Sequence, residues 1–220
     1  MKWFILLALL VLDPVFADTT ESLPMPKPSS AVPAATIESL HGVVEEFNRA
    51  AGSWPARFSS PDEKKRFYLK WVQALQQAWL LETRDGNSEM VLAVLADLYR
   101  QGHNMDVPGA GDRANEAIQK CLGLWPDSVA CHFSASYFYL SINPRFAPKG
   151  EASLLRLRTL LAPKINMNVE RGLVFAYLYQ ERNKEALQQL DYIIQIDPAA
   201  AWAKEFRKGL LEGKGKVMVK

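Results

Sequence analysis

The sequence predicts an all-α protein, and three observations support this fold class. Beyond residue 36, apolar residues recur at intervals of three and four, which is the spacing of one face of a helix. Pro, Gly, Asn and Asp cluster between these runs and supply signals that end helices and form turns. No segment shows the sustained alternation of apolar and polar residues that is typical of a half-buried strand. We therefore expect consecutive helices joined by turns.

Residues 1–17 have the pattern of a secretory signal peptide. Lys2 provides a positive start, and Ala17 is a small residue suited to a cleavage site. The stretch from Trp3 to Leu12 is apolar, but as a helix it would cover only about half of a bilayer, which is too short for a transmembrane span. We therefore expect an exported protein that is periplasmic or secreted. Whether the signal is cleaved or kept as an anchor stays open.

Residues 18–35 are rich in Pro, Ser, Thr and Ala, which is typical of a flexible and partly extended linker. Helical periodicity begins after this linker, and residues 36–88 are predicted to form an N-terminal helical pair. The second helix has a strong start, because Ser60 is a good N-cap, Pro61 suits the first turn and Glu63 completes a capping box. The two predicted helices span residues 36–51 and 61–83.

Helices then follow one another in pairs over residues 89–200. Short polar turns join most partners, so neighbouring helices are expected to lie antiparallel. A loop at 106–111 contains Gly109 and Gly111, and we interpret it as a plain turn because a phosphate-binding loop would need a preceding strand and a Lys. Residues 201–220 are predicted to form a final amphipathic helix and a basic tail. The helices predicted in the paired region span residues 90–102, 113–124, 126–141, 151–161, 168–180 and 184–196.

The last helix pair, in residues 167–200, has a spacing of residue types that resembles a tetratricopeptide repeat (TPR). In that family two antiparallel helices share about 34 residues, an aromatic ring fills the wedge between them, a small residue lies at their closest approach and a Pro ends the unit. Residues 89–126 and 127–163 look like two degenerate copies with longer turns. The matches to the aromatic and small positions are Tyr99 and Ala114, Tyr137 and Ala152, and Tyr177 and Ala186, and the last copy adds Leu173, Leu190, Ile193 and Pro198.

The resemblance implies a short right-handed solenoid of antiparallel helix pairs, closed by a capping helix in residues 201–220. The first helix of each pair would line a concave groove that suits an extended peptide or a partner helix. The alternative interpretation is a plain antiparallel helical bundle, in which the same apolar spacings only build a core. The groove residues that the resemblance implies are Asp97, Arg100, Ser128, His132, Phe138, Tyr139, Asn168, Arg171, Phe175 and Tyr179.

The chain has two cysteines, Cys121 and Cys131, which lie symmetrically about Pro126. A turn at Pro126 would place both thiols at the same height on facing helices, where an exported protein can oxidise them. Packed helix axes lie about 8–10 Å apart, whereas a disulfide needs Cα atoms within about 7 Å. The sequence therefore leaves open whether the pair forms a disulfide or only packs. His132 beside the pair does not complete a metal site, because no second pair of ligands has the required spacing.

Composition and motifs favour a binding role over catalysis. The net charge is +2, with 26 basic and 24 acidic residues, which argues against the concentrated basic surface that nucleic-acid binding needs. The three histidines are scattered, and the sequence contains no catalytic or cofactor-binding motif. We expect a non-catalytic protein–protein interaction module without a cofactor, acting as a scaffold or assembly factor in the cell envelope. The alternatives are an accessory subunit for a cell-wall or secretion enzyme and, less favoured, a cryptic hydrolase, and self-association stays open.

Overall fold

The computed structural model of the protein describes residues 23–29 and 32–213, so the predicted signal peptide lies outside the described residues. These ranges contain helices and no β-strand, which confirms the all-α prediction. Of the described helices, none is both long enough and apolar enough to cross a membrane. The elements are α1 (Ile37–Ala51), α2 (Pro61–Asp85), α3 (Glu89–Asn104), α4 (Ala110–Leu124), α5 (Val129–Ile142), the short 3-10 helix η1 (Pro144–Phe146), α6 (Ala147–Leu160), α7 (Met167–Tyr179), α8 (Asn183–Ile196) and α9 (Ala201–Leu211).

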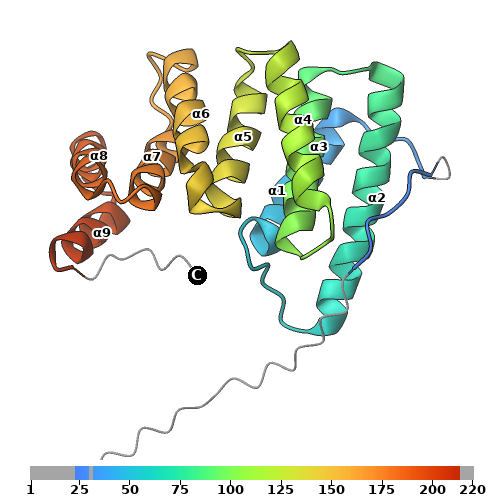
Figure 1. Ribbon diagram of the computed structural model, residues 1–220, viewed down its shortest axis with the longest axis horizontal. Helices are drawn as coiled ribbons and strands as arrows, with labels where there is room; N and C mark the ends of the chain where they lie inside the picture. Colours follow the sequence, from blue (N-terminus) through green and yellow to red (C-terminus); the bar gives the residue numbers. More distant parts are fainter. Residues whose placement is uncertain (1–22, 30–31, 214–220) are drawn as a thin grey trace, which may run out of the picture.

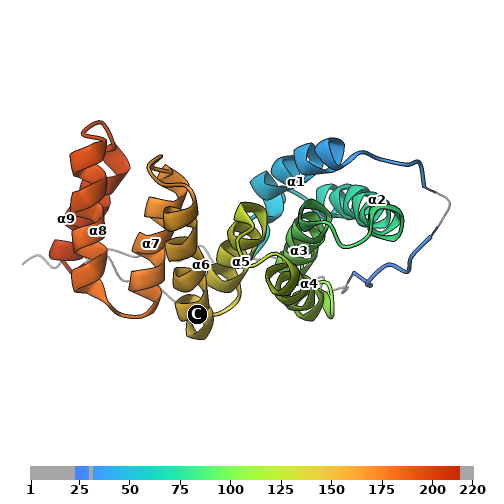
Figure 2. The same cartoon turned by 90° about the horizontal axis from the view of Figure 1, so that it is seen from above.

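The helices follow one another along the long axis of the molecule (Figure 1). α2 lies at one end, with α1 and α3 packed beside it, and α8 and α9 lie at the other end (Figures 1 and 2). From α3 to α9 each helix packs against the next one in the chain. In addition, α3 contacts α5 and α5 contacts α7. The architecture is therefore a row of adjacent helices in which alternate helices also meet.

Two helices begin three or four residues earlier than the sequence predicts. α6 begins at Ala147, four residues before the predicted start at residue 151, because Pro148 lies in the first turn, where no helical hydrogen bond needs its missing N–H. α4 begins at Ala110, three residues before the predicted start, and Gly109 precedes it with φ +76°, a left-handed conformation that glycine tolerates. In both cases residues expected to interrupt the helix introduce it instead.

The largest cluster of buried side chains joins the helices from α1 to α5. Trp71 on α2 is fully buried in it, and its indole N–H donates a 2.7 Å hydrogen bond to the backbone oxygen of Leu98. Gly102 on α3 allows this ring to approach, because a Cβ there would lie 2.5 Å from a ring carbon. One smaller cluster holds α5, α6 and α7 together, and another holds α7, α8 and α9. α7 contributes to both small clusters and so connects the C-terminal helices to the rest of the row.

Cys121 and Cys131 form a disulfide, which decides the question that the sequence leaves open. Their Cα atoms are 5.8 Å apart, because α4 and α5 pack against each other on either side of the turn that contains Pro126. Both cysteines are buried. The bond is consistent with the oxidising compartment that an exported protein would reach.

The described part of the predicted linker is extended, but it is not free of the helices. Residues 23–29 run along α2 (Figures 1 and 2). The Tyr68 hydroxyl on α2 donates a hydrogen bond to the backbone oxygen of Pro24. Leu23 and Met25 pack against the main apolar cluster. This segment therefore covers part of α2 and belongs to the fold.

Candidate functional site

The helices α3, α5 and α7, which are the first helices of the three predicted pairs, carry tyrosine at the same place. Counted from the first residue of each helix, the eleventh residue is Tyr99, Tyr139 and Tyr177, respectively. Tyr99 and Tyr139 are buried and Tyr177 is half-buried. From sequence spacing, Tyr137 is matched to this place in α5. The equivalent residue is Tyr139 instead, because α5 begins at Val129, two residues later than that match requires.

A small residue lies near the start of each second helix, α4, α6 and α8, and faces the core there. These residues are Ala114, Gly150 and Ala186, and all three are buried. A Cβ on Gly150 would lie 2.8 Å from the side chain of Leu140, so α5 and α6 approach closely at a residue that lacks one. Ala152, which the sequence spacing matches to this place, is exposed. The structure thus assigns the close approach in this pair to Gly150.

The candidate site is a surface formed by α5 and α7. The fifth and ninth residues of these helices are Phe133 and Tyr137 in α5, and Arg171 and Phe175 in α7. Because α5 contacts α7, equivalent positions on the two helices are expected to face the same side. Two further residues of α7 extend this surface one turn in each direction. We call it the α5–α7 face, and its residues are Phe133, Tyr137, Asn168, Arg171, Phe175 and Tyr179.

Tyr137 is the most exposed aromatic side chain of the α5–α7 face. It is 42% exposed, and its ring stacks on Phe133 with 6.1 Å between the ring centroids. The guanidinium carbon of Arg100 lies 5.7 Å from the centroid of the same ring. Partial burial raises the pKa of Tyr137, and the negative charges of Asp97 and Glu45 add to that rise. The hydroxyl therefore stays protonated at neutral pH and can donate a hydrogen bond to a partner.

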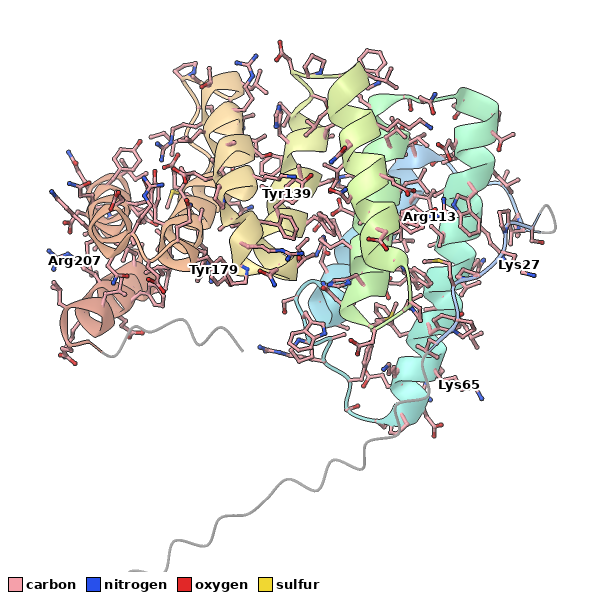
Figure 3. The ribbon with its side chains drawn as sticks, in the orientation of Figure 1. Lys27, Lys65, Arg113, Tyr139, Tyr179 and Arg207 are labelled. Atoms are coloured by element: carbon pink, nitrogen blue, oxygen red, sulfur yellow. A yellow bond between two sulfur atoms is a disulfide. The ribbon has the colours of Figure 1, made fainter. Side chains whose placement is uncertain are left out.

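α9 borders the α5–α7 face on the α7 side. The guanidinium of Arg171 lies 4.9 Å from the ring centroid of Trp202, and the rings of Phe175 and Phe206 are 5.9 Å apart. These contacts orient both α7 side chains while Arg171 stays exposed. Tyr179 is the last residue of α7 and is labelled in Figure 3; it is half-buried, and burial raises its pKa. Contacts with α9 thus fix the side chains of Arg171 and Phe175 at the α7 side of the α5–α7 face.

Half of the groove residues implied by the sequence are buried, so they are not part of an accessible surface. On α5 the cause is the two-residue shift, which turns Phe138 and Tyr139 toward the main cluster. Ser128 is the N-cap of α5, and a ring nitrogen of His132 lies 2.9 Å from the backbone oxygen of Pro126. The buried residues are Arg100, Ser128, His132, Phe138 and Tyr139, the half-buried ones are Asp97, Phe175 and Tyr179, and the exposed ones are Asn168 and Arg171.

Arg100 is buried because α1 covers its side of α3. Its guanidinium donates hydrogen bonds of 2.7 Å to the backbone oxygen of Gly52 and to the side-chain oxygen of Asn48. It also donates to the carboxylate of Asp97 at 3.1 Å. Arg100 therefore fastens the end of α1 to α3, and at 2% exposure its guanidinium is not accessible to a partner. α1 occupies the place where the first predicted repeat would offer its part of the groove.

A second ion pair, with a buried carboxylate and a half-buried arginine, joins α6 and α7, and a glutamine of α8 bonds to it. Glu170 is 2% exposed, and Arg158 donates a 3.1 Å hydrogen bond from its Nε to that carboxylate. The amide of Gln189 donates a further bond of 2.7 Å to the same group. Arg158 and Glu170 both line a cavity of about 110 Å³, but they form an ion pair with each other that joins two helices. Among the described residues, no group of three or more His, Cys, Asp or Glu side chains is placed to hold a metal ion.

Comparison with protein-family models, with curated proteins and with solved structures finds no match for this chain. The chemistry of the α5–α7 face therefore follows from its own side chains. The aromatic rings supply contact area, while the tyrosine hydroxyls and Asn168 can form hydrogen bonds to a peptide backbone. Arg171 adds an exposed positive charge. Such a surface can bind another chain.

Proposed function

We propose that the protein is a TPR-like interaction module whose helix pairs form a short right-handed solenoid. The pairs α3–α4, α5–α6 and α7–α8 are the repeats, α1 and α2 cover one end, and α9 covers the other. The recurrence of Tyr99, Tyr139 and Tyr177 at one helix position supports this assignment. The contacts of α3 with α5 and of α5 with α7 also support it, because first helices of successive repeats meet in such a stack.

The proposed partner site is the α5–α7 face, and the exposure of Tyr137 beside Phe133 is the observation that carries this proposal. Clustered aromatic side chains that stay in contact with water are typical of binding surfaces. The partner is a peptide or helix that lays apolar side chains on these rings and places a carboxylate or backbone oxygen near Arg171.

The proposed role is that of a scaffold or assembly factor in the cell envelope. The predicted signal peptide and the Cys121–Cys131 disulfide support this location. An accessory subunit of a cell-wall or secretion enzyme would use the same face, and the identity of the captured partner separates the two roles.

Affinity capture from an envelope extract tests this proposal. The bait is the chain of residues 18–220, and the test variant carries Tyr137→Ser and Arg171→Glu. The matched control carries Tyr192→Ser and Lys184→Glu on α8, where Tyr192 is 37% exposed, so an equal tyrosine replacement and an equal change in charge are made away from the α5–α7 face. We expect one protein to be retained by the wild type and the control and lost by the test variant.

Titration of that protein against the purified variants gives the size of the effect. Loss of an aromatic and an arginine contact at the centre of an interface typically costs about 2 kcal/mol or more, which is about thirtyfold in Kd. Circular dichroism checks that each variant is folded. Equal retention by all three baits, or equal loss from both variants, would contradict the assignment of the α5–α7 face.

A further inference from the structure

The first turns of α2 carry a basic surface that the proposed function does not use. Lys65, Arg66 and Lys70 are exposed, and Lys65 lies near the beginning of α2, at one end of the molecule (Figure 3). Leu69 lies within one helical turn of all three and is 59% exposed. We call these four residues the α2 patch. It combines positive charge with an aliphatic side chain that is open to water.

The carboxylates near the α2 patch do not cancel its charge. Glu63, at the start of α2, counts as a full negative charge, because hydrogen bonds from Ser59 lower its pKa. Glu46 lies 3.8 Å from Lys70, but both side chains are more than half exposed, so the pair contributes little in water. Asp62 is the remaining exposed carboxylate of these turns. The basic residues outnumber these three carboxylates, and they are Arg57, Lys64, Lys65, Arg66 and Lys70.

We propose that the α2 patch docks the protein onto an anionic lipid surface. Lysine and arginine side chains are attracted to anionic headgroups, and an exposed aliphatic side chain gains free energy by entering the boundary between headgroups and acyl chains. The α2 patch supplies both from one helix face. Residues 23–29 lie along α2, yet all four side chains of the patch stay exposed.

The path of the chain supports a lipid surface as the occupant. The described chain begins at Leu23, and the next residue, Pro24, accepts a hydrogen bond from Tyr68, the residue just before Leu69. The apolar run that ends at Leu12 precedes Leu23 by eleven residues, which span at most about 35–40 Å when fully extended. While that run is inserted in a membrane during export or as an anchor, the α2 patch is therefore held near the same surface.

This orientation leaves the rest of the molecule accessible. α2 and α9 lie at opposite ends of the long axis, so docking through α2 directs the other helices away from the bilayer (Figure 1). The α5–α7 face uses different helices and is free to bind a partner at the same time. Lipid docking does not depend on partner binding, and the failure of one leaves the other standing.

Vesicle co-sedimentation with residues 18–220, which include every described residue, tests the proposal. The probes are vesicles of phosphatidylcholine alone and vesicles that also contain phosphatidylglycerol. The control has the same change in net charge at the opposite end of the molecule, where Figure 3 labels Arg207. The variants are Lys65→Glu/Arg66→Glu/Lys70→Glu as the test, Lys204→Glu/Arg207→Glu/Lys208→Glu on α9 as the control, and Leu69→Ser for the aliphatic contact.

We expect the wild type and the α9 control to bind the phosphatidylglycerol vesicles and to be released by high salt, which screens the charges. Each basic residue at an anionic surface contributes about fivefold, so the α2 test variant, which loses three, should bind about a hundredfold more weakly. Leu69→Ser should weaken binding and keep its salt dependence. The proposal is overturned if the wild type does not bind these vesicles, if the test variant binds equally well, or if the α9 control loses binding to the same extent.

Discussion

Replacing Arg100 with Met is expected to lower the free energy of unfolding by about 3–5 kcal/mol. The side chain is 2% exposed, and its guanidinium donates to the backbone oxygen of Gly52, to Asn48 and to Asp97. Methionine fills much of the space but donates no hydrogen bond, so these acceptors lose a charged partner in a buried place. A hydrogen bond to a charged group contributes about 1.5–3 kcal/mol, and two such bonds account for the expected loss.

Urea unfolding followed by far-ultraviolet circular dichroism measures this change. The control is Arg113→Met, because the Arg113 side chain is 63% exposed and its contact with Glu116 at 3.6 Å is a surface pair. We expect the control to change stability by less than about 0.5 kcal/mol. A loss below about 1 kcal/mol for Arg100→Met would refute the conclusion that Arg100 fastens α1 to α3. Unchanged stability together with lost partner binding would restore Arg100 as a groove residue.

Three further predictions follow from the disulfide, from the register of α5 and from its tyrosines. Cys121 and Cys131 are separated by 10 residues, and replacing both with serine should lower the free energy of unfolding by about 3 kcal/mol. Thermal melts of the wild type that superimpose with and without reductant would contradict this. Tyr139→Phe removes a 3.0 Å hydrogen bond to Asn115 and should lower the free energy of unfolding by about 1 kcal/mol. Tyr137→Phe should leave the urea midpoint unchanged. A larger loss of stability for Tyr137→Phe than for Tyr139→Phe would show that the register of α5 is wrong. Burial raises the pKa of Tyr139, and partial burial raises that of Tyr137, so the unfolded chain releases these protons first. The contribution of these tyrosines to stability should be constant at neutral pH, and stability should fall as pH rises through about 10, with a shallower fall in Tyr139→Phe.

Local signals account for most of the secondary structure that the sequence predicts. Ser60 caps α2 as expected, and its side chain accepts a 3.1 Å hydrogen bond from the N–H of Glu63. The carboxylate of Glu63, however, bonds to Ser59 rather than to Ser60. Such signals act within a few residues, so they predict where a helix begins but not every partner of its cap.

The register of α5 shows why the candidate site was only partly predictable. This helix carries aromatic and small residues all around, so a period of 3.6 does not reveal which side faces the core. The start at Val129, after the cap at Ser128, decides that Tyr139 is buried and Tyr137 exposed. The spacing of the tyrosines does not distinguish the two registers, because Tyr139 lies 40 residues after Tyr99 and 38 before Tyr177, whereas Tyr137 lies 38 after Tyr99 and 40 before Tyr177.

The sequence by itself determined the helical class, most helix ends and the pairing of successive helices, because periodicity, caps and turn residues act over short distances along the chain. The tertiary structure decided which polar and aromatic side chains remain accessible. Arg100 is buried by α1, which precedes it by about fifty residues, and Arg171 is oriented by α9, which follows it in the chain. The disulfide likewise depended on how closely α4 and α5 pack. These contacts join segments far apart in sequence, and only the packing of whole helices brings them together.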